Sequence, residues 1–449
     1  MTAFLTALDH FLWGPGTLVL LMGTGLFLTV RTRFLPWRNL GWAIRSALGR
    51  EARRTGADGA VSPFSSLMTA LAATIGTGNI VGVATALTAG GPGALVWMEL
   101  AAMAGLSTKF AECLLAVKYR RRSHGELYGG PMYVMRDRLG SKWLGALFAF
   151  FAVCASFGIG SMVQANAIAE SLDTAFSIPA TVTGPVTAAL ALLILLGGAR
   201  QVSAVSAVMV PAMAVFYLAA GLAVIAGNLE QLPGALLTML QCAFSPRAAA
   251  GGAAGTASML AAARWGVARG VFSNESGLGS AAISAAAAAT DSPARQGYIS
   301  MTGTFFDTMV VCTVTGFAIC CSGVLGKADG AALTILAFRS VLGPAGGIFV
   351  SVSIVLFAFS TILGWAYQGE TALAFLLGPG ARAPYRCLFT LAALWGAGQR
   401  VELVFRLSDI CNALMCLPNL LCLLCLSGEV ARDAVSFQAV IGPKGREKL

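Results

Sequence analysis

Two short stretches, each rich in glycine and polar residues, decide how this sequence folds. They are ATIGTGNIVG at residues 73–82 and FSNESGLGS at residues 272–280. Glycine weakens a helix by about 1 kcal/mol relative to alanine, so each stretch predicts a break in the apolar run that contains it. Backbone at membrane depth unwinds only where it lines a protein-buried or wet cavity. In a membrane protein, the two breaks would therefore mark a buried site.

The composition indicates such a membrane protein. The chain has 449 residues, of which 57% are hydrophobic and only 11% charged, and its mean hydropathy is +0.77. A soluble domain normally carries about 25% charged residues. The composition thus excludes an ordinary cytosolic enzyme, a disordered chain and a nucleic-acid-binding domain.

Eleven apolar runs are candidates for membrane helices, each of which needs about 20 mostly apolar residues. The runs cover residues 11–30, 63–89, 93–117, 145–171, 179–197, 202–227, 258–290, 299–323, 346–376, 385–398 and 402–427. We therefore expect an all-α integral membrane protein with eleven transmembrane helices.

The distribution of basic residues predicts the orientation of these helices. Residues 1–10 contain no Lys or Arg, so the first run does not resemble a cleaved signal peptide. Most of the 30 basic residues fall in alternate connections, beginning with residues 31–54. By the positive-inside rule, the N-terminus lies outside and the C-terminus in the cytoplasm. We expect a multi-pass protein of a bacterial-type plasma membrane, and the net charge of +10 then requires no nucleic acid.

Residues 35–48, after the first run, alternate apolar and basic side chains. This pattern predicts an interfacial helix on the cytoplasmic leaflet. A solvated loop is the alternative interpretation. The two histidines, His10 and His124, lie far apart, and most of the eleven cysteines lie in apolar runs. We therefore expect no zinc, haem or other cofactor.

The breaks occupy matching positions once the first run is set aside. The remaining ten runs divide into two sets of five, and each break lies in the first run of its set. Paired glycine-interrupted helices of this kind are typical of inverted-repeat secondary transporters. The predicted divisions are an N-terminal helix with its basic segment (1–62), a first repeat (63–227), an extracytoplasmic connection (228–257), a second repeat (258–427) and a cytoplasmic tail (428–449). Close packing of helices is the other explanation of the glycines, but Asn79, Asn274 and Glu275 would then be costly passengers.

Seven motifs along nearly the whole chain carry a family resemblance. They are TALAATIGTGNIVGVATALTAGGPGALVWM (69–98), KFAECLLAVKYR (109–120), GGPMYVM (129–135), GVFSNESGLGS (270–280), FFDTMVVCTVTG (305–316), TILGWAYQGE (361–370) and NALMCLPNL (412–420). In this order and spacing, they resemble the alanine or glycine:cation symporter family. The resemblance implies a fold like that of the neurotransmitter:sodium symporters, with two inverted five-helix repeats and one extra N-terminal helix. It also implies uptake of a small neutral amino acid driven by sodium, less often by protons.

Six positions depart from the pattern that this resemblance leads us to expect. Two of them, Arg406 and Ser408, stand before Asp409 where less polar residues are expected. Ser276, Ala282 and Ala285 replace Ala, Pro and His after the second break, and Glu99 stands where an apolar or aromatic residue is expected. The departures leave the expected fold unchanged. They put the cytoplasmic end of the seventh run in question.

A zwitterionic substrate needs donors for its carboxylate and oxygens for its ammonium group. The helix beginning near Gly78 and Asn79 offers backbone N–H groups, and Gly76 and Gly78 permit close approach. Unwound carbonyls at Phe272 and Ser273 suit the ammonium group. Including their neighbours, the candidate substrate residues at the breaks are Gly76, Thr77, Gly78, Asn79, Phe272, Ser273 and Asn274.

Further site residues come from the resemblance. It implies that Gln164 faces the substrate, although a polar residue there also suits an interhelical hydrogen bond. Thr361 and Trp365, four residues apart on one helix face, would join Phe272 in a wall that excludes large side chains. By analogy with the related fold, sodium would bind the carbonyls of Ala72 and Ile75 and the hydroxyls of Ser360 and Thr361, with Asn79 near a second ion.

Carboxylates within the membrane are functional candidates. Glu275 lies in the second break and is either a coupling residue or a cap on the next half-helix. Asp307 and Asp409 are expected to hold helices together. The main prediction is a sodium-coupled symporter whose partners are the amino acid and membrane lipids, with no obligatory protein partner. A proton-coupled symporter, a facilitator or channel and a membrane enzyme remain alternatives.

Overall fold

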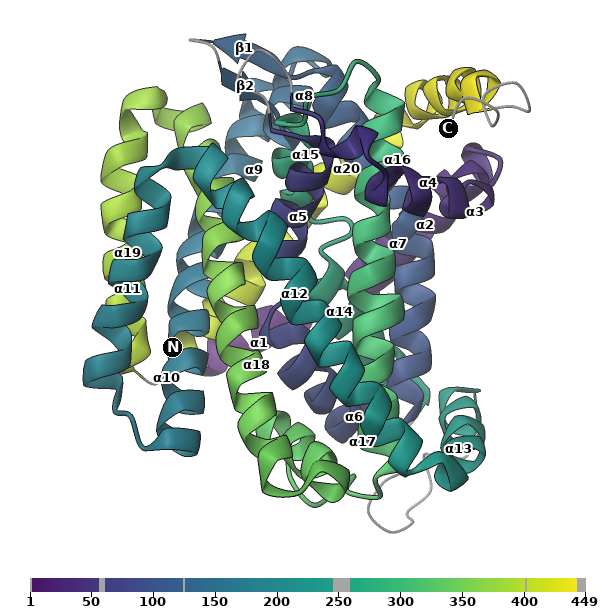
Figure 1. Ribbon diagram of the computed structural model, residues 1–449. Helices are drawn as coiled ribbons and strands as arrows, with labels where there is room; N and C mark the ends of the chain where they lie inside the picture. The colour runs from purple at the N-terminus through teal and green to yellow at the C-terminus, as the bar shows by residue number, and fades with distance from the viewer. Residues whose placement is uncertain (1, 56–60, 124–125, 245–258, 400–401, 442–449) are drawn as a thin grey trace.

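The computed structural model describes residues 2–55, 61–123, 126–244, 259–399 and 402–441. His124, the end of the predicted connection (245–257) and the end of the tail (442–449) lie outside the described residues. The described chain is a bundle of helices with one two-stranded antiparallel sheet (Figure 1). The all-α prediction therefore holds except for this small hairpin.

The elements before Pro63 are short helices and one longer helix, α2 (Pro15–Arg31), which packs against α7 (Gly93–Lys118) and α20 (Glu402–Ile441). In chain order, these elements are α1 (Thr2–Leu12), α2, α3 (Leu35–Arg38), α4 (Leu40–Leu48) and the 3₁₀ turn η1 (Glu51–Arg53). The predicted interfacial helix thus consists of two short helices, α3 and α4. Trp42 of α4 packs edge-on against Tyr298, with ring centroids 5.7 Å apart, so part of its apolar face is covered by protein.

The next elements, up to the middle of the chain, contain two π-helical segments, η2 and η3. The elements are α5 (Pro63–Thr74), η2 (Gly78–Gly82), α6 (Val83–Gly90), α7 (Gly93–Lys118), β1 (Arg121–Ser123), β2 (Glu126–Tyr128), α8 (Pro131–Asp137), α9 (Lys142–Ala155), η3 (Ser156–Met162), α10 (Val163–Phe176), α11 (Ala180–Leu196), α12 (Gly198–Gly227), the 3₁₀ turn η4 (Leu229–Gln231) and α13 (Leu232–Phe244). The last helix, α13, lies in the segment that we expected to be a connection.

The second half begins after the undescribed residues 245–258. Its elements are α14 (Met259–Asn274), α15 (Ser280–Ala286), α16 (Pro293–Thr304), the π-helical segment η6 (Phe305–Cys312), α17 (Thr313–Cys321), α18 (Gly330–Leu377), the 3₁₀ turn η7 (Pro379–Ala381), α19 (Arg382–Ala397) and α20 (Glu402–Ile441). The long helix α7 packs against α14 and α16, and α11 packs against α19 (Figure 1).

Each predicted apolar run contains a helix, but the helices differ in length. Among the described residues, seven spans are long and apolar enough to cross a membrane, and the bent pair α5–α6 would make eight. The helices α11, α14 and α19 have 17, 16 and 16 residues. They are shorter than the 18 residues taken as the minimum for a span. The structure therefore indicates a multi-pass membrane protein. The number of membrane helices reaches eleven only if the short helices also cross the membrane.

Two helices meet inside α18. The backbone at Gly343 is not helical (φ +61°), so the second helix begins just after it, close to the predicted residue 346. Residues 330–342 form a helix that the predicted runs left out. One predicted boundary is wrong. Helix α20 continues beyond residue 427 to Ile441. This extension contains Glu429, Arg432 and Asp433, so the apolar pattern ends before the helix does.

Capping residues explain several helix starts. The Ser62 hydroxyl accepts the N–H of Ser65 at 3.1 Å, and Pro63 occupies the first turn of α5. Ser292 and Pro293 begin α16 in the same way. The side-chain oxygen accepts an N–H group of the first turn that has no carbonyl partner within the helix. Proline has no backbone N–H, and none is needed at this position.

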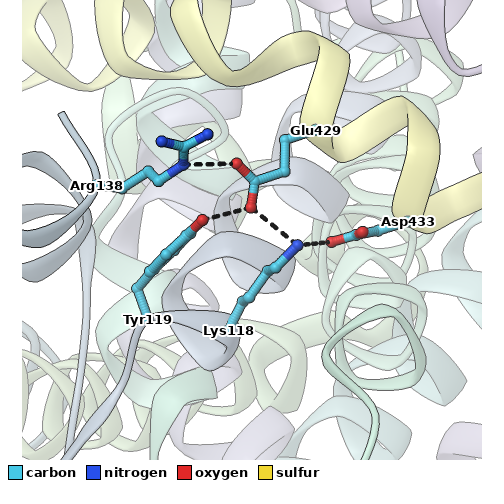
Figure 2. A network of polar contacts seen from close by, with 5 residues as sticks. All are labelled: Lys118, Tyr119, Arg138, Glu429 and Asp433. Carbon is cyan, nitrogen blue, oxygen red and sulfur yellow. Dashed lines mark hydrogen bonds and ion pairs between the residues drawn. The ribbon is translucent and has the colours of Figure 1, made fainter.

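Charged contacts gather at the end of the bundle that holds β1–β2 and α3–α4 (Figure 1). Figure 2 shows Glu429 of α20 paired with Lys118 at 2.8 Å and Arg138 at 2.9 Å. Tyr119 also donates to Glu429, and Lys118 contacts Asp433 at 2.6 Å. These contacts fasten the end of α20 to the end of α7 and the segment after α8.

Candidate functional site

The first break separates α5 from η2 and α6 and bends the chain by 52°. The Gly76 N–H donates to the Asn79 side-chain oxygen at 2.9 Å. This replaces the helical bond that Gly76 would give to the carbonyl of Ala72. In the described chain, no hydrogen bond is found for the N–H groups of Thr77 and Gly78, as expected at a helix start. The break thus presents free donors and a freed carbonyl.

The second break lies between α14 and α15. Phe272 and Ser273, whose backbone we expected to be unwound, lie instead in the last turn of α14, where carbonyls lack the N–H partners of a continuing helix. Its backbone is left-handed at Glu275 (φ +54°), Gly277 (φ +98°) and Gly279 (φ +81°). The Asn274 side-chain oxygen accepts the N–H of Ser276 at 2.9 Å and closes a local turn. Glycine adopts this conformation without steric cost, whereas Glu275 is held there by its surroundings.

Asp307, in the π-helical segment η6, joins the two breaks. The Asn79 amide donates to its carboxylate at 2.8 Å, and the Ser273 hydroxyl donates at 2.8 Å. The Thr308 hydroxyl donates at 2.8 Å and itself accepts from Asn274 at 3.1 Å. Asp307 is fully buried. The expectation that it holds helices together agrees with these contacts.

A small cavity of about 20 Å³ lies between the breaks, enough for one or two water molecules. Predicted residues Gly76, Thr77, Gly78, Gln164, Phe272, Glu275, Thr361 and Trp365 line it, together with Ala73, Thr74, Ile159, Leu278 and Asn412. The structure therefore brings the breaks, the fourth predicted span and the ninth to one place. Asn79, Ser273 and Asn274 lie behind this lining in the Asp307 network.

Gln164 bridges two walls of the cavity. Its side-chain oxygen accepts from the Thr77 hydroxyl at 3.3 Å, and its amide donates to the Ile159 carbonyl at 3.0 Å. It thus links the first break to the π-helical segment η3. Gln164 therefore both lines the cavity and makes the interhelical hydrogen bond, so the two interpretations of this residue do not exclude each other.

Trp365 and Thr361 form a wall from α18. A Cβ at Gly76 would overlap the Thr361 hydroxyl, and a Cβ at Gly160 would overlap Trp365. Trp365 is only 3% exposed. These close approaches need glycine, and they hold the indole against the cavity.

The predicted sodium residues lie together beside the cavity. The Ser360 hydroxyl is 3.3 Å from the Ile75 carbonyl oxygen and 2.8 Å from that of Phe357. Thr361 hydroxyl oxygen is next in sequence and abuts Gly76, and Ala72 is one turn before Gly76. Hydroxyl and carbonyl oxygens are the ligands that a hard cation prefers. The donor set therefore suits sodium.

Glu275 faces the cavity, but a different carboxylate supports the second break. The Ser280 hydroxyl donates to Glu275 at 2.5 Å, so the side chain reaches the first residue of α15. Glu112 of α7 accepts the Gly277 N–H at 2.9 Å and the Asn419 amide at 2.7 Å. Asn419 also donates to the Gly277 carbonyl at 2.9 Å. The break is thus held mainly by α7 and α20.

Sequence reasoning missed three functional candidates. Glu112 and Asn419 lie in motifs that we used only for the resemblance, and the signal available was an intramembrane carboxylate. Asn412 is 2% exposed and lines the cavity. Within the described residues its side-chain oxygen has no hydrogen-bond partner. It is an acceptor available to a ligand.

Four of the six departures are accommodated by local contacts. Ser276 and Thr304 share a hydrogen bond at 2.9 Å, and Glu99 accepts from Thr313 at 2.8 Å. Ala282 and Ala285 are buried against α7 in a cluster of small side chains. None of the four disturbs either break.

Fold and site together define a multi-pass transporter in which two broken helices meet at a buried polar cavity. The chain belongs to the sodium:alanine symporter family, whose model matches residues 1–447. The resemblance carried by the seven motifs is thereby confirmed, and the chain is an amino-acid:cation symporter.

Two relatives and one solved structure place this chain more closely. It is 45% identical over 448 residues to the sodium/alanine symporter AgcS of Methanococcus maripaludis, with 98% of this chain and 97% of AgcS covered. It is 36% identical over 426 residues to the probable sodium/glutamine symporter GlnT of Bacillus subtilis, covering 94% and 87%. Its fold matches that of MhsT in complex with L-phenylalanine, with a TM-score of 0.59 and 14% identity over 85% of this chain and 92% of MhsT.

Proposed function

We propose that this protein imports a small neutral amino acid, alanine or glycine, together with sodium by alternating access. The observation that carries the proposal is the meeting of both breaks, Trp365 and an oxygen cluster around one small cavity. The 45% identity to a relative named a sodium/alanine symporter supports the choice of substrate and ion. No further cofactor enters the proposal.

The substrate carboxylate would bind the free N–H groups of Thr77 and Gly78 at the start of η2. A helix N-terminus favours an anion through its aligned peptide dipoles. The ammonium group would bind the carbonyls at Phe272 and Ser273 and the side-chain oxygens of Gln164 and Asn412. Burying these charges without partners would cost several kcal/mol, so both ends of the zwitterion need such groups.

The size of the substrate follows from the walls. Trp365 and Phe272 line the cavity, which in this conformation has room for about 20 Å³. A methyl group needs a modest rearrangement, whereas a large side chain needs displacement of the indole. Small neutral amino acids therefore fit this site best.

Sodium would bind the carbonyl oxygens of Ala72 and Ile75 and the hydroxyls of Ser360 and Thr361. These groups connect α5, which ends at the first break, to α18. The ion would hold the two helices together while the substrate is bound, which couples the two ligands. Asn79 is committed to Gly76 and Asp307, so a second ion near it would require a different side-chain arrangement.

For the whole chain we propose eleven membrane helices in the divisions given by the sequence, with an inverted repeat at 63–227 and 258–427. The short helices α11, α14–α15 and α19 would complete the count. The N-terminus would lie outside and the C-terminus in the cytoplasm of a bacterial-type plasma membrane.

A proton-coupled symporter is the second candidate, favoured by one observation: Glu275 lines the cavity. Its carboxyl group would then carry the proton while the oxygen cluster has a structural role. Uptake of labelled alanine into proteoliposomes, with sodium and proton gradients imposed separately, distinguishes the two. The proposal predicts accumulation above equilibrium with sodium alone; accumulation only with a proton gradient would assign coupling to Glu275, and equilibration with neither would make the protein a facilitator.

A further inference from the structure

A second and much larger cavity, of about 970 Å³, is lined by residues of α3, α4 and the β1–β2 hairpin. These elements lie at one end of the bundle (Figure 1). This larger cavity shares no lining residue with the cavity between the breaks. Its walls come from α3, α4, η1, the start of α5, the hairpin, the chain after α15 and the start of α16. Its volume is that of a small-molecule site.

The lining is strongly basic. Seven arginines line the cavity against only two carboxylates, Glu51 and Asp291, and no lysine takes part. Arg295 forms an ion pair with Glu51, with a nitrogen–oxygen distance of 3.4 Å. The cavity therefore has a positive potential.

Several of these guanidinium groups are available. Arg38, Arg50 and Arg54 are exposed, and in the described ranges no hydrogen bond or ion pair is found for their guanidinium groups. Arg120 is different, because it donates to the carbonyls of Ala288 and Thr290 at 2.6 and 2.7 Å. It fixes the wall, while the other three remain free to bind an anion.

The chemistry of the lining suits a phosphate group. The guanidinium fork binds phosphate oxygens in pairs. Two exposed apolar residues lie next to the lining segments in the sequence: Phe34, before α3, is 52% exposed, and Leu48, at the end of α4, is 51% exposed. They offer a place for acyl chains, and Trp42 of the lining is of the type enriched at membrane interfaces. Basic pockets beside cytoplasmic helix ends are typical sites for anionic lipid head groups.

We propose that this cavity binds a phosphate group, supplied by the head group of an anionic phospholipid in the adjacent leaflet. The inference does not depend on the transported substrate or on the coupling ion. A general positive surface would attract anions diffusely, whereas this site requires the arginines that line the cavity.

The test uses the full-length protein in neutral detergent. Thermal stabilisation is titrated with dioctanoyl phosphatidylglycerol, with dioctanoyl phosphatidylcholine, and with glycerol phosphate as the soluble source of phosphate. The variant R50Q/R54Q removes two lining arginines. The matched control R31Q/R33Q removes two exposed arginines that lie nearby but outside the lining.

We expect saturable stabilisation by phosphatidylglycerol and none by phosphatidylcholine. The half-saturating concentration should rise about 25-fold in R50Q/R54Q, about fivefold for each arginine, and less than about twofold in R31Q/R33Q. Equal weakening in both variants, or equal effects of the two lipids, would overturn the site. Glycerol phosphate that binds as well as the lipid would overturn the lipid source.

A measurement on the unmodified protein covers the case in which R50Q/R54Q does not fold. Recognition of phosphate by exposed arginines is screened by salt. The half-saturating concentration of phosphatidylglycerol should therefore rise when choline chloride is raised from about 50 mM to about 500 mM at a fixed sodium concentration, because the screening length shortens. No dependence on salt would refute the proposal.

Discussion

Replacing Ser360 with alanine is the sharpest perturbation of the proposed sodium site. Ser360 is fully buried, and its hydroxyl lies 3.3 Å from the Ile75 carbonyl and 2.8 Å from the Phe357 carbonyl. The substitution removes one oxygen from the proposed sodium ligands. It leaves Thr361, the two breaks and the walls of the cavity in place.

The magnitude follows from the charge of the ion. A contact between a polar group and a charged one is worth about 1.5–3 kcal/mol, whereas the neutral hydrogen bond contributes about 1 kcal/mol to folding. The half-saturating sodium concentration should therefore rise about 10- to 150-fold. Folding stability should fall by only about 1 kcal/mol.

Ser353 provides the matched control. It lies seven residues earlier on the same helix, two turns away on the same face, and is buried. Its hydroxyl donates to the Phe349 carbonyl at 2.8 Å. The variant S353A loses a comparable helix contact without touching the first break, so its sodium dependence should remain within about twofold of the wild type.

The assay is the initial rate of alanine uptake into proteoliposomes as external sodium varies at a fixed membrane potential. Protein recovery and gel filtration show that each variant is folded. A folded S360A protein with the sodium dependence of S353A would refute the assignment of Ser360 to the ion. A change in alanine affinity at saturating sodium, without a change in sodium dependence, would place Ser360 in the substrate site instead.

Three other substitutions test separate parts of the account. Trp365→Ala should raise the uptake of leucine relative to alanine about tenfold or more, because the cavity gains room; an unchanged ratio in competition assays would remove Trp365 from the selectivity wall. Asn412→Ala should raise the alanine KM about tenfold through a lost contact to the ammonium group, with little change in sodium dependence; an unchanged KM would exclude Asn412. Glu429→Gln should lower the thermal midpoint by a few degrees through weakened contacts to Lys118 and Arg138, and an unchanged midpoint would show that this network is not stabilising.

The breaks were predictable because their cause is local. Glycine together with Asn or Ser in an apolar run destabilises a continuous helix. Both breaks lie within the stretches that this pattern indicated. The same local signal explains why Gly76, Thr77 and Gly78 were recognised as cavity residues. In an unbroken helix their N–H groups would be bonded to carbonyls one turn earlier and would not be available to a ligand.

The tertiary supports of the site were less predictable. Glu112 and Asn419 are more than 300 residues apart and meet only because α7 and α20 both pack against the second break. Nothing in the local sequence distinguishes Asn412, which faces the cavity, from Asn419, which holds the backbone. The two lie seven residues apart, on nearly the same face of α20, so their roles depend on which part of the fold each turn of the helix packs against.

The π-helical segments show a further limit. Asp307 reaches both Asn79 and Ser273 from η6, and Ile159 meets Gln164 within the region of η3. A wide helical turn changes the face on which later side chains lie. A sequence pattern read at regular helical spacing therefore cannot place these residues.

Equilibrium binding of labelled alanine to the purified protein, with sodium or choline at equal ionic strength, tests the central claim most directly. If the oxygens around Ser360 bind sodium beside the substrate site, the two ligands must strengthen each other's binding. We predict that the Kd for alanine falls at least about tenfold in sodium, equivalent to a coupling of about 1.4 kcal/mol. The same Kd in sodium and in choline would contradict a shared site for ion and amino acid.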